Sequence, residues 1–280
     1  MTLSHTSARA LAHPIGAASG LVDIEGNTIY YDIAGAGLPI VFVHDGLLHR
    51  VGFDHQFEAF AKNFTVIRYD RPGYGDSHPP QVSYSHVGTL KKLLDLLSLE
   101  SIILIGGSAG GRIAIDFAIA HPDRAGALVL VGAVVSGLDS TDHMWYRGWR
   151  NEWGETMADH LEFWANDPWL IAEENQAARA RFRQVLTAAP QNLENFPVPM
   201  LDQFQSVRRL SEIQAPTLLV IGESDIADNH AHSGVIQVGI AGAEREVVTR
   251  SGHLVYFEQP EKFNRLVLDF LARRVNAQPA

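Results

Sequence analysis

Short apolar runs recur along the chain and alternate with segments of helical periodicity. The runs are continuous and rich in β-branched residues, which is typical of strands buried on both faces of a parallel sheet. Six such strands are predicted: Pro39–Val43, Thr65–Tyr69, Ser101–Ile105, Ala127–Val131, Pro216–Ile221 and Arg245–Thr249. Two shorter strands, Leu21–Ile24 and Thr28–Asp32, precede them around a Glu-Gly-Asn turn. We expect this leading pair to form an antiparallel edge of the sheet.

Helical patterns lie between these strands. Four helices are predicted: Phe53–Ala61, Val87–Leu97, Ala109–Ala120 and Glu261–Arg274. The third must end at His121, because a residue that precedes a proline disfavours the α region. Alternating strands and helices predict an α/β fold with a mostly parallel central sheet and flanking helices.

The alternation stops between residues 137 and 210, where no strong strand pattern occurs. All five tryptophans of the chain lie there: Trp145, Trp149, Trp153, Trp164 and Trp169. We expect 137–210 to form a helical cap inserted into a core made of 21–136 and 211–280, and residues 1–20 to form a mobile tail. The rings could make the cap's own core or the wall of an apolar substrate pocket, and the sequence leaves both readings open.

Composition narrows the class of protein. Of 280 residues, 46% are hydrophobic and 19% are charged, so a large core can be buried. The 22 Lys and Arg against 32 Asp and Glu give a net charge of −10, which disfavours binding to nucleic acid or anionic lipid. There is no cysteine, which excludes disulfides, thiol catalysis and cysteine-based zinc sites. No apolar run reaches the roughly 20 residues of a membrane span, so we expect a cytoplasmic protein.

One pentapeptide, Gly106-Gly107-Ser108-Ala109-Gly110, has the pattern G-x-S-x-G and occurs once. It follows a predicted strand and begins a predicted helix. Such a strand–turn–helix lifts a serine hydroxyl above the sheet, beside the N–H groups of the helix terminus. An ordinary glycine-rich turn is the alternative, but this context favours Ser108 as a nucleophile.

A nucleophilic serine needs a base and an acid that orients the base. Asp225 and His253 each follow one of the last two predicted strands, at the sheet edge where parallel sheets bind their ligands. Asp228 and Asp139 are alternative acids. The types of side chain that could bind a metal also cluster here, at Asp225, Asp228, His230 and His232. We interpret this segment as a polar loop and the start of a helix, and we expect no metal or cofactor.

These motifs together resemble the α/β-hydrolase fold. The resemblance runs from about residue 21 to the C-terminus and includes PIVFVHDGLLHR, YDRPGYGDS, GGSAGG, LLVIGESD and SGHLVYFEQPEKF. The order serine, aspartate, histidine is also that of the family. The resemblance implies Ser108 as nucleophile, Asp225 as acid and His253 as base.

The chain departs from the family pattern at His44-Asp45-Gly46, where the resemblance implies glycine after the histidine. A carboxylate beside a developing oxyanion is repulsive unless it points away or is hydrogen-bonded. We expect the N–H of Gly46, or failing that of Leu47, to form the oxyanion hole with the N–H of Ala109. His44 is expected beside the substrate pocket.

The function expected from these residues is hydrolysis of a small-to-medium hydrophobic carboxylic ester or lactone. The same triad serves carbon–carbon bond hydrolases of ring-cleavage products, cofactor-free haloperoxidases or perhydrolases, and acyltransferases. A ligand-binding receptor on a hydrolase scaffold is the non-enzyme alternative, and Asp45 is the feature that favours it. Arg112 lies four residues after Ser108. We expect it to form a structural ion pair rather than to bind a carboxylate of the substrate. The sequence does not indicate an oligomeric state.

Overall fold

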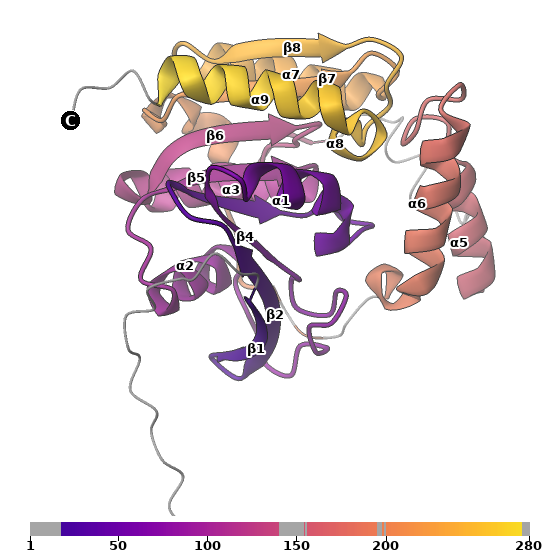
Figure 1. Ribbon diagram of the computed structural model, residues 1–280, viewed down its shortest axis with the longest axis horizontal. Coiled ribbons are helices and arrows are strands. Elements are labelled where there is room, and N and C mark those ends of the chain that lie inside the picture. Colours follow the sequence, from indigo (N-terminus) through magenta and orange to yellow (C-terminus); the bar gives the residue numbers. More distant parts are fainter. Residues whose placement is uncertain (1–17, 140–153, 155, 195–197, 199, 276–280) are drawn as a thin grey trace, which may run out of the picture.

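A computed structural model describes residues 18–139, 154, 156–194, 198 and 200–275. Its centre is an eight-stranded sheet in the order β1-β2-β4-β3-β5-β6-β7-β8 (Figure 1). The strands are β1 Ala18–Ile24, β2 Asn27–Ala34, β3 Pro39–Val43, β4 Thr65–Tyr69, β5 Ile102–Gly107, β6 Ala125–Val131, β7 Thr217–Gly222 and β8 Glu244–Val248.

The sheet is parallel from β4 to β8 and antiparallel at its leading edge. β1 pairs antiparallel with β2, and β2 pairs antiparallel with β4. The antiparallel edge is therefore confirmed. β1 begins at Ala18, so the tail predicted over 1–20 is too long by three residues. The cause is the register of the hairpin, which pairs Ala18 with Ile33 and extends the strand beyond its apolar residues.

Helices cover both faces of the sheet. Aliphatic residues of α2 (His86–Leu96), α3 (Ala109–Ala120) and α7 (Ala227–Gly239) form one core cluster against it. An aromatic-rich cluster on the other face involves α1 (Asp54–Phe60), α8 (Val255–Glu258) and α9 (Pro260–Arg274). The sequence indicated only a helix start near Asp228, and α7 was not predicted in full. The α/β-hydrolase fold is confirmed by this sheet and its flanking helices.

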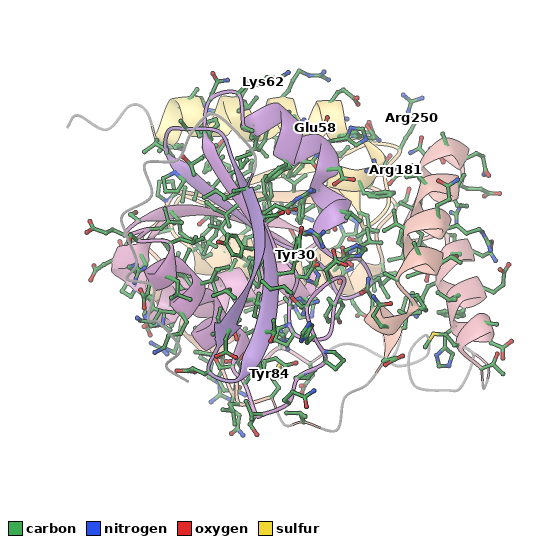
Figure 2. The ribbon with its side chains drawn as sticks, turned by 60° about the horizontal axis from the view of Figure 1, so that its bottom comes forward. Tyr30, Glu58, Lys62, Tyr84, Arg181 and Arg250 are labelled. Carbon is green, nitrogen blue, oxygen red and sulfur yellow. The ribbon has the colours of Figure 1, made fainter. Side chains whose placement is uncertain are left out.

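The described part of 137–210 contains two helices, α5 (Met157–Asn166) and α6 (Gln176–Ala188), which lie side by side at one end of the sheet (Figure 1). Phe182 and Leu186 of α6 are fully buried in the aromatic cluster. Arg181 lies on the same helix, with its guanidinium 4.5 Å from the ring centroid of Phe257 (Figure 2). None of the described helices is long and apolar enough to cross a membrane.

Candidate active site

Ser108 lies in a strained turn between β5 and α3, here called the elbow, and the neighbouring glycines make this turn possible. Ser108 has φ 51° and ψ −114°, between the end of β5 and the start of α3. Side chains at its neighbours would collide with backbone: a Cβ on Gly106 would lie 2.4 Å from the Gly110 carbonyl oxygen, and one on Gly110 would lie 2.0 Å from that of Val43. Only glycine fits such close approaches. The strain is held by the packing of the sheet against α3, and Ser108 stays partly exposed.

The N–H of Ala109 is the first of α3. The first N–H groups of a helix have no intrahelical acceptor, and the helix dipole adds partial positive charge there. Ala109 is partly exposed, like Ser108. This N–H can therefore donate to an oxyanion formed at a substrate on Ser108.

Asp225 and His253 meet across the ends of β7 and β8. His253 Nδ1 lies 2.8 Å from Asp225 Oδ2, and both residues are buried. The other carboxylate oxygen accepts from the N–H of Ile226 at 2.7 Å and from the side-chain amide of Asn229 at 2.7 Å. With Oδ1 occupied, Oδ2 receives the Nδ1–H of the imidazole, and Nε2 is left as the nitrogen that can take a proton.

The two alternative acids lie elsewhere. Asp139 is exposed in the segment after β6. Asp228 is buried in the first turn of α7, close enough to His232 to raise that histidine's pKa, although burial lowers the His232 pKa more. Nδ1 of His232 accepts from the N–H of Val135 at 3.1 Å. Among the described residues no group of three or more acidic or histidine side chains is arranged to hold a metal ion.

Asn229 is a residue of this site that the sequence analysis missed. Besides its bond to Asp225, its amide nitrogen lies 2.9 Å from His253 Nδ1. Its oxygen is buried without a hydrogen-bond partner. The only sequence signal was its spacing of four from Asp225, which becomes meaningful once a helix is known to begin between them.

His44 shapes the loop after β3. Its Nδ1 donates to the Asp45 carbonyl at 2.8 Å, and its Nε2 accepts the N–H of Arg71 at 3.0 Å. Burial, followed by the charge of Arg71, lowers the His44 pKa well below its ordinary value, which keeps the ring neutral. Both ring nitrogens are committed to backbone groups. His44 therefore holds the loop through both ring nitrogens, and its place beside a substrate pocket stays a prediction.

The carboxylate of Asp45 is fully buried and fully hydrogen-bonded. It accepts the N–H groups of Leu47 at 2.6 Å and Leu48 at 2.8 Å through one oxygen, and the hydroxyl of Tyr256 through the other. Burial, followed by the charge of Asp45, raises the Tyr256 pKa well above its ordinary value, so the phenol remains a donor. Leu47 is thereby removed as an oxyanion donor. The N–H of Gly46 has no acceptor in the described part of the chain.

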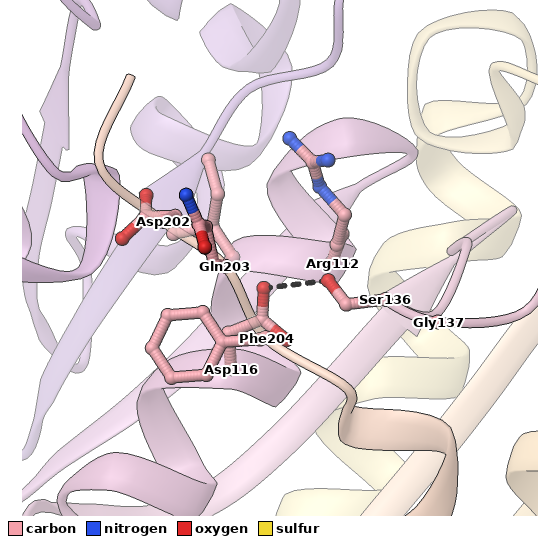
Figure 3. Close-up of a pocket in the computed structure, with 8 residues that line it drawn as sticks. Arg112, Asp116, Ser136, Gly137, Asp202, Gln203 and Phe204 are labelled. Carbon is pink, nitrogen blue, oxygen red and sulfur yellow. Dashed lines mark hydrogen bonds between the residues drawn. The ribbon is translucent and has the colours of Figure 1, made fainter. Parts of the chain in front are cut away.

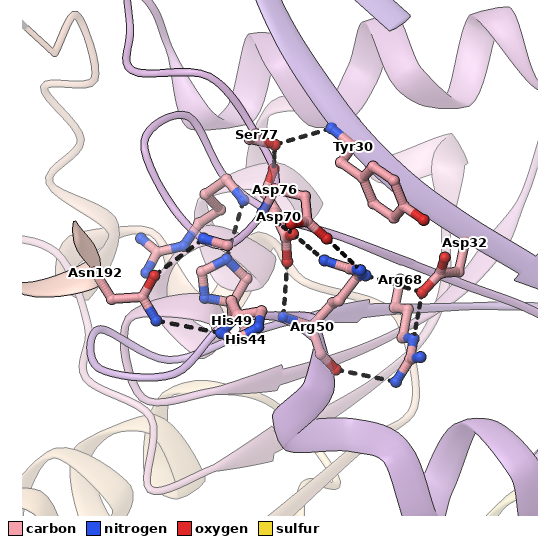
Figure 4. A network of polar contacts seen from close by, with 12 residues as sticks. Tyr30, Asp32, His44, His49, Arg50, Arg68, Asp70, Asp76, Ser77 and Asn192 are labelled. Atoms are coloured by element: carbon pink, nitrogen blue, oxygen red, sulfur yellow. Dashed lines mark hydrogen bonds and ion pairs between the residues drawn. The ribbon is translucent and has the colours of Figure 1, made fainter. Parts of the chain in front are cut away.

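A polar network of Arg50 and Asn192 anchors the same loop (Figure 4). Arg50 forms ion pairs with three carboxylates, those of Asp32, Asp70 and Asp76. Asn192, which follows α6, donates to the Leu47 carbonyl at 3.0 Å. The loop's backbone is thus fixed before any substrate binds.

Residues between α5 and α6 also hold the segment that carries His253. The N–H of His253 donates to the Trp169 carbonyl at 2.7 Å. The buried carboxylate of Glu258 accepts from Gly252 at 2.6 Å and from Ala172 at 2.9 Å. Glu258 joins the two segments and was another residue that the sequence analysis missed.

The tryptophans expected to line the pocket are only partly described. Trp164 packs against the aromatic cluster and meets Phe163 edge-on at 5.1 Å. Trp169 is 37% exposed. The remaining three, Trp145, Trp149 and Trp153, lie outside the described residues.

The structure thus combines an α/β-hydrolase sheet, a strained serine turn after β5 and a buried aspartate–histidine pair after β7 and β8. Residues 40–266 match the model of the alpha/beta hydrolase family, and the chain belongs to that family. It is 32% identical, over 87% of its length and 90% of the relative's, to a 2-hydroxy-6-oxononadienedioate/2-hydroxy-6-oxononatrienedioate hydrolase of Paraburkholderia xenovorans (strain LB400). It is 28% identical, over 90% of its length and 94% of the relative's, to a 2-hydroxy-6-oxo-6-phenylhexa-2,4-dienoate hydrolase of Comamonas testosteroni. A solved N-acyl homoserine lactone degrading enzyme superposes with a TM-score of 0.72 at 26% identity, covering 90% of this chain and all of the other.

Proposed function

We propose that this chain is a serine hydrolase of small-to-medium hydrophobic carboxylic esters or lactones, with Ser108, His253 and Asp225 as its triad. The observation that carries the proposal is the buried hydrogen bond between Asp225 and His253 in a chain whose Ser108 sits at a strained strand–helix turn. A hydrogen-bonded acid fixes the imidazole tautomer and stabilises the imidazolium that forms.

The reaction proceeds in two halves. Ser108 Oγ attacks the acyl carbon while His253 Nε2 takes its proton, and the N–H groups of Gly46 and Ala109 bind the oxyanion. The tetrahedral intermediate collapses, His253 returns the proton to the departing alkoxide, and an acyl-enzyme remains. Water then attacks that acyl group with His253 as base. The acid leaves, and Ser108 regains its proton.

The hydrogen bonds of Asp45 support catalysis over the receptor alternative. Its charge is already compensated by two N–H groups and one phenol. The donors converge on the carboxylate and turn it toward Tyr256, so its repulsion on an oxyanion is reduced. An aspartate at position 45 is thus compatible with a functional oxyanion hole. We assign the helical cap, residues 137–210, to covering this site and setting acyl-chain preference.

Carbon–carbon bond hydrolysis of a ring-cleavage product is the second candidate, favoured by the similarity to the dienedioate and dienoate hydrolases. The same triad could cleave a bond beside a ketone when the departing carbon is protonated or stabilised as an enolate. The leaving group, rather than the triad, distinguishes the two candidates.

A substrate panel tests the proposal. Purified enzyme would be assayed with 4-nitrophenyl esters of increasing chain length, γ- and δ-lactones, and 2-hydroxy-6-oxo-dienoates, with Ser108→Ala as control. We expect ester or lactone turnover that falls by about 10⁴–10⁶ in the variant. Turnover of the dienoates alone would select the second candidate. Stoichiometric labelling of Ser108 by a phosphonate without turnover of any substrate would select the receptor.

A further inference from the structure

A polar cavity begins one helical turn from Ser108 along α3. Its volume is about 150 Å³. It is enclosed by the first turns of α3, the segment after β6 and the chain that returns from the cap (Figure 3). Arg112, Asp116, Ser136 and Asp202 contribute polar side chains to its wall.

Both carboxylates in this wall already have donors. Asp116 accepts from the hydroxyl of Ser136 at 2.8 Å and from that of Ser206 at 2.5 Å. Asp202 accepts from the hydroxyl of Ser85 and from the N–H of His86 at 2.6 Å. Neither carboxylate needs the nearby arginine to satisfy its oxygens.

Arg112 is the charged group of the wall whose donors remain free. Its guanidinium makes no hydrogen bond or ion pair with the described residues, so the structural ion pair expected from the sequence is not formed there. Figure 3 shows it extending away from the bond between Asp116 and Ser136. The side chain is partly buried and presents a planar fork of donors.

Two segments of the cavity wall are continuous with segments that contact the candidate triad. The N–H of Arg112 donates to the Ser108 carbonyl at 3.1 Å, so the two residues are about 6 Å apart along the helix axis. On the opposite wall, Ser136 follows Gly132 by four residues. A Cβ on Gly132 would lie 2.7 Å from His253 Nδ1. A substrate chain of a few carbons is long enough to span this separation between Ser108 and Arg112.

We infer that Arg112 binds a carboxylate of the substrate, so that the preferred substrates are half-esters of short dicarboxylic acids or lactones that carry an acid group. The inference rests on the proposed function and narrows its substrate class. An acidic substrate is repelled by a chain of net charge −10 unless a local cation receives it. A guanidinium does so with two parallel hydrogen bonds to one carboxylate.

The test compares charged and neutral esters of equal length. The 4-nitrophenyl half-esters of succinate, glutarate and adipate would be paired with the 4-nitrophenyl esters of butanoate, pentanoate and hexanoate. Arg112→Met would be assayed beside Arg208→Met, which removes the same charge at an exposed position outside the cavity. We expect Arg112→Met to lower kcat/KM about 10- to 100-fold for at least one half-ester and less than about 3-fold for its neutral partner. Arg208→Met should leave both unchanged.

A binding measurement keeps this inference separate from the proposed function. Calorimetry would measure the affinity of the glutarate, succinate and adipate monomethyl esters, and of the neutral methyl esters of pentanoate, butanoate and hexanoate, for Ser108→Ala and for Ser108→Ala/Arg112→Met. Loss of binding about 10-fold or more in the double variant supports the subsite even if no ester is turned over. Equal losses for charged and neutral ligands, or no loss for any chain length, would overturn it. Absence of ester turnover in the wild-type enzyme would count against the proposed function alone.

Discussion

The hydroxyl of Tyr256 donates a hydrogen bond to the carboxylate of Asp45, across 211 residues of sequence. The same ring lies against the elbow, because a Cβ on Gly107 would be 2.8 Å from its Cε1. Asp45 follows β3, and Tyr256 comes three residues after His253. One contact therefore connects the loop after β3, the elbow at Ser108 and the segment that carries His253.

Tyr256→Phe should weaken this connection. The variant leaves a buried carboxylate with one donor fewer, and a hydrogen bond to a charged group is worth about 1.5–3 kcal/mol. We expect the free energy of unfolding in urea to fall by that amount and kcat to fall with it. Asp45→Asn combined with Tyr256→Phe should cost less than the sum of the single changes. Strict additivity in the double-mutant cycle would mean that the two side chains are not coupled.

Asp225→Asn should cost more activity than Asp228→Asn or Asp139→Asn. Asparagine at 225 removes the charge that stabilises the imidazolium and favours the wrong tautomer, a loss of about 10⁴ in kcat for a triad of this kind. The other two residues lie outside the hydrogen bond to His253, and their variants serve as matched controls. A larger effect at Asp228 would transfer the acid's role to that residue.

Asn229→Leu tests whether the amide tunes the base. An amide N–H close to His253 Nδ1 disfavours protonation of the ring, so its removal should move the acidic limb of the kcat/KM profile to higher pH. Asn229→Asp, which adds a second carboxylate, should move that limb further in the same direction. Reduced activity with an unchanged pH profile would instead assign Asn229 a purely structural role.

His86→Leu should reduce the acid sensitivity of the fold. Burial, followed by the charges of Arg71 and Arg112, lowers the His86 pKa well below its ordinary value of 6.5, and its Nδ1 has no partner. The unfolded chain takes up a proton below about pH 6.5 that the folded chain does not, so stability is lost as the pH falls through that range. Between pH 8 and pH 5 the variant should therefore lose less of its free energy of unfolding than the wild type does. Parallel curves for the two proteins, measured by urea titration at each pH, would contradict this.

The sequence by itself determined the sheet and the elbow. Strands β3 and β4 occupy the predicted residues without change, because continuous β-branched runs have few other stable conformations. The turn at Ser108 could be predicted because its glycines are required by local contacts, either within a few residues or with the adjacent strand. The chain order of Ser108, Asp225 and His253 also needed no structure.

Only the tertiary structure decided the surroundings of these residues. From the sequence, Asp45 was expected to weaken the oxyanion hole. In the structure its carboxylate faces Tyr256. No local pattern could indicate this partner, because it is too distant in sequence. Asn229 was missed because the polar start of α7 resembles a loop. Arg112 was expected to form an ion pair with an acidic residue. The nearby Asp116 instead accepts hydrogen bonds from two serine hydroxyls, and these come from segments that are distant in sequence. Local patterns fix backbone conformation, whereas the pairing of buried polar groups depends on which distant segments the fold brings together.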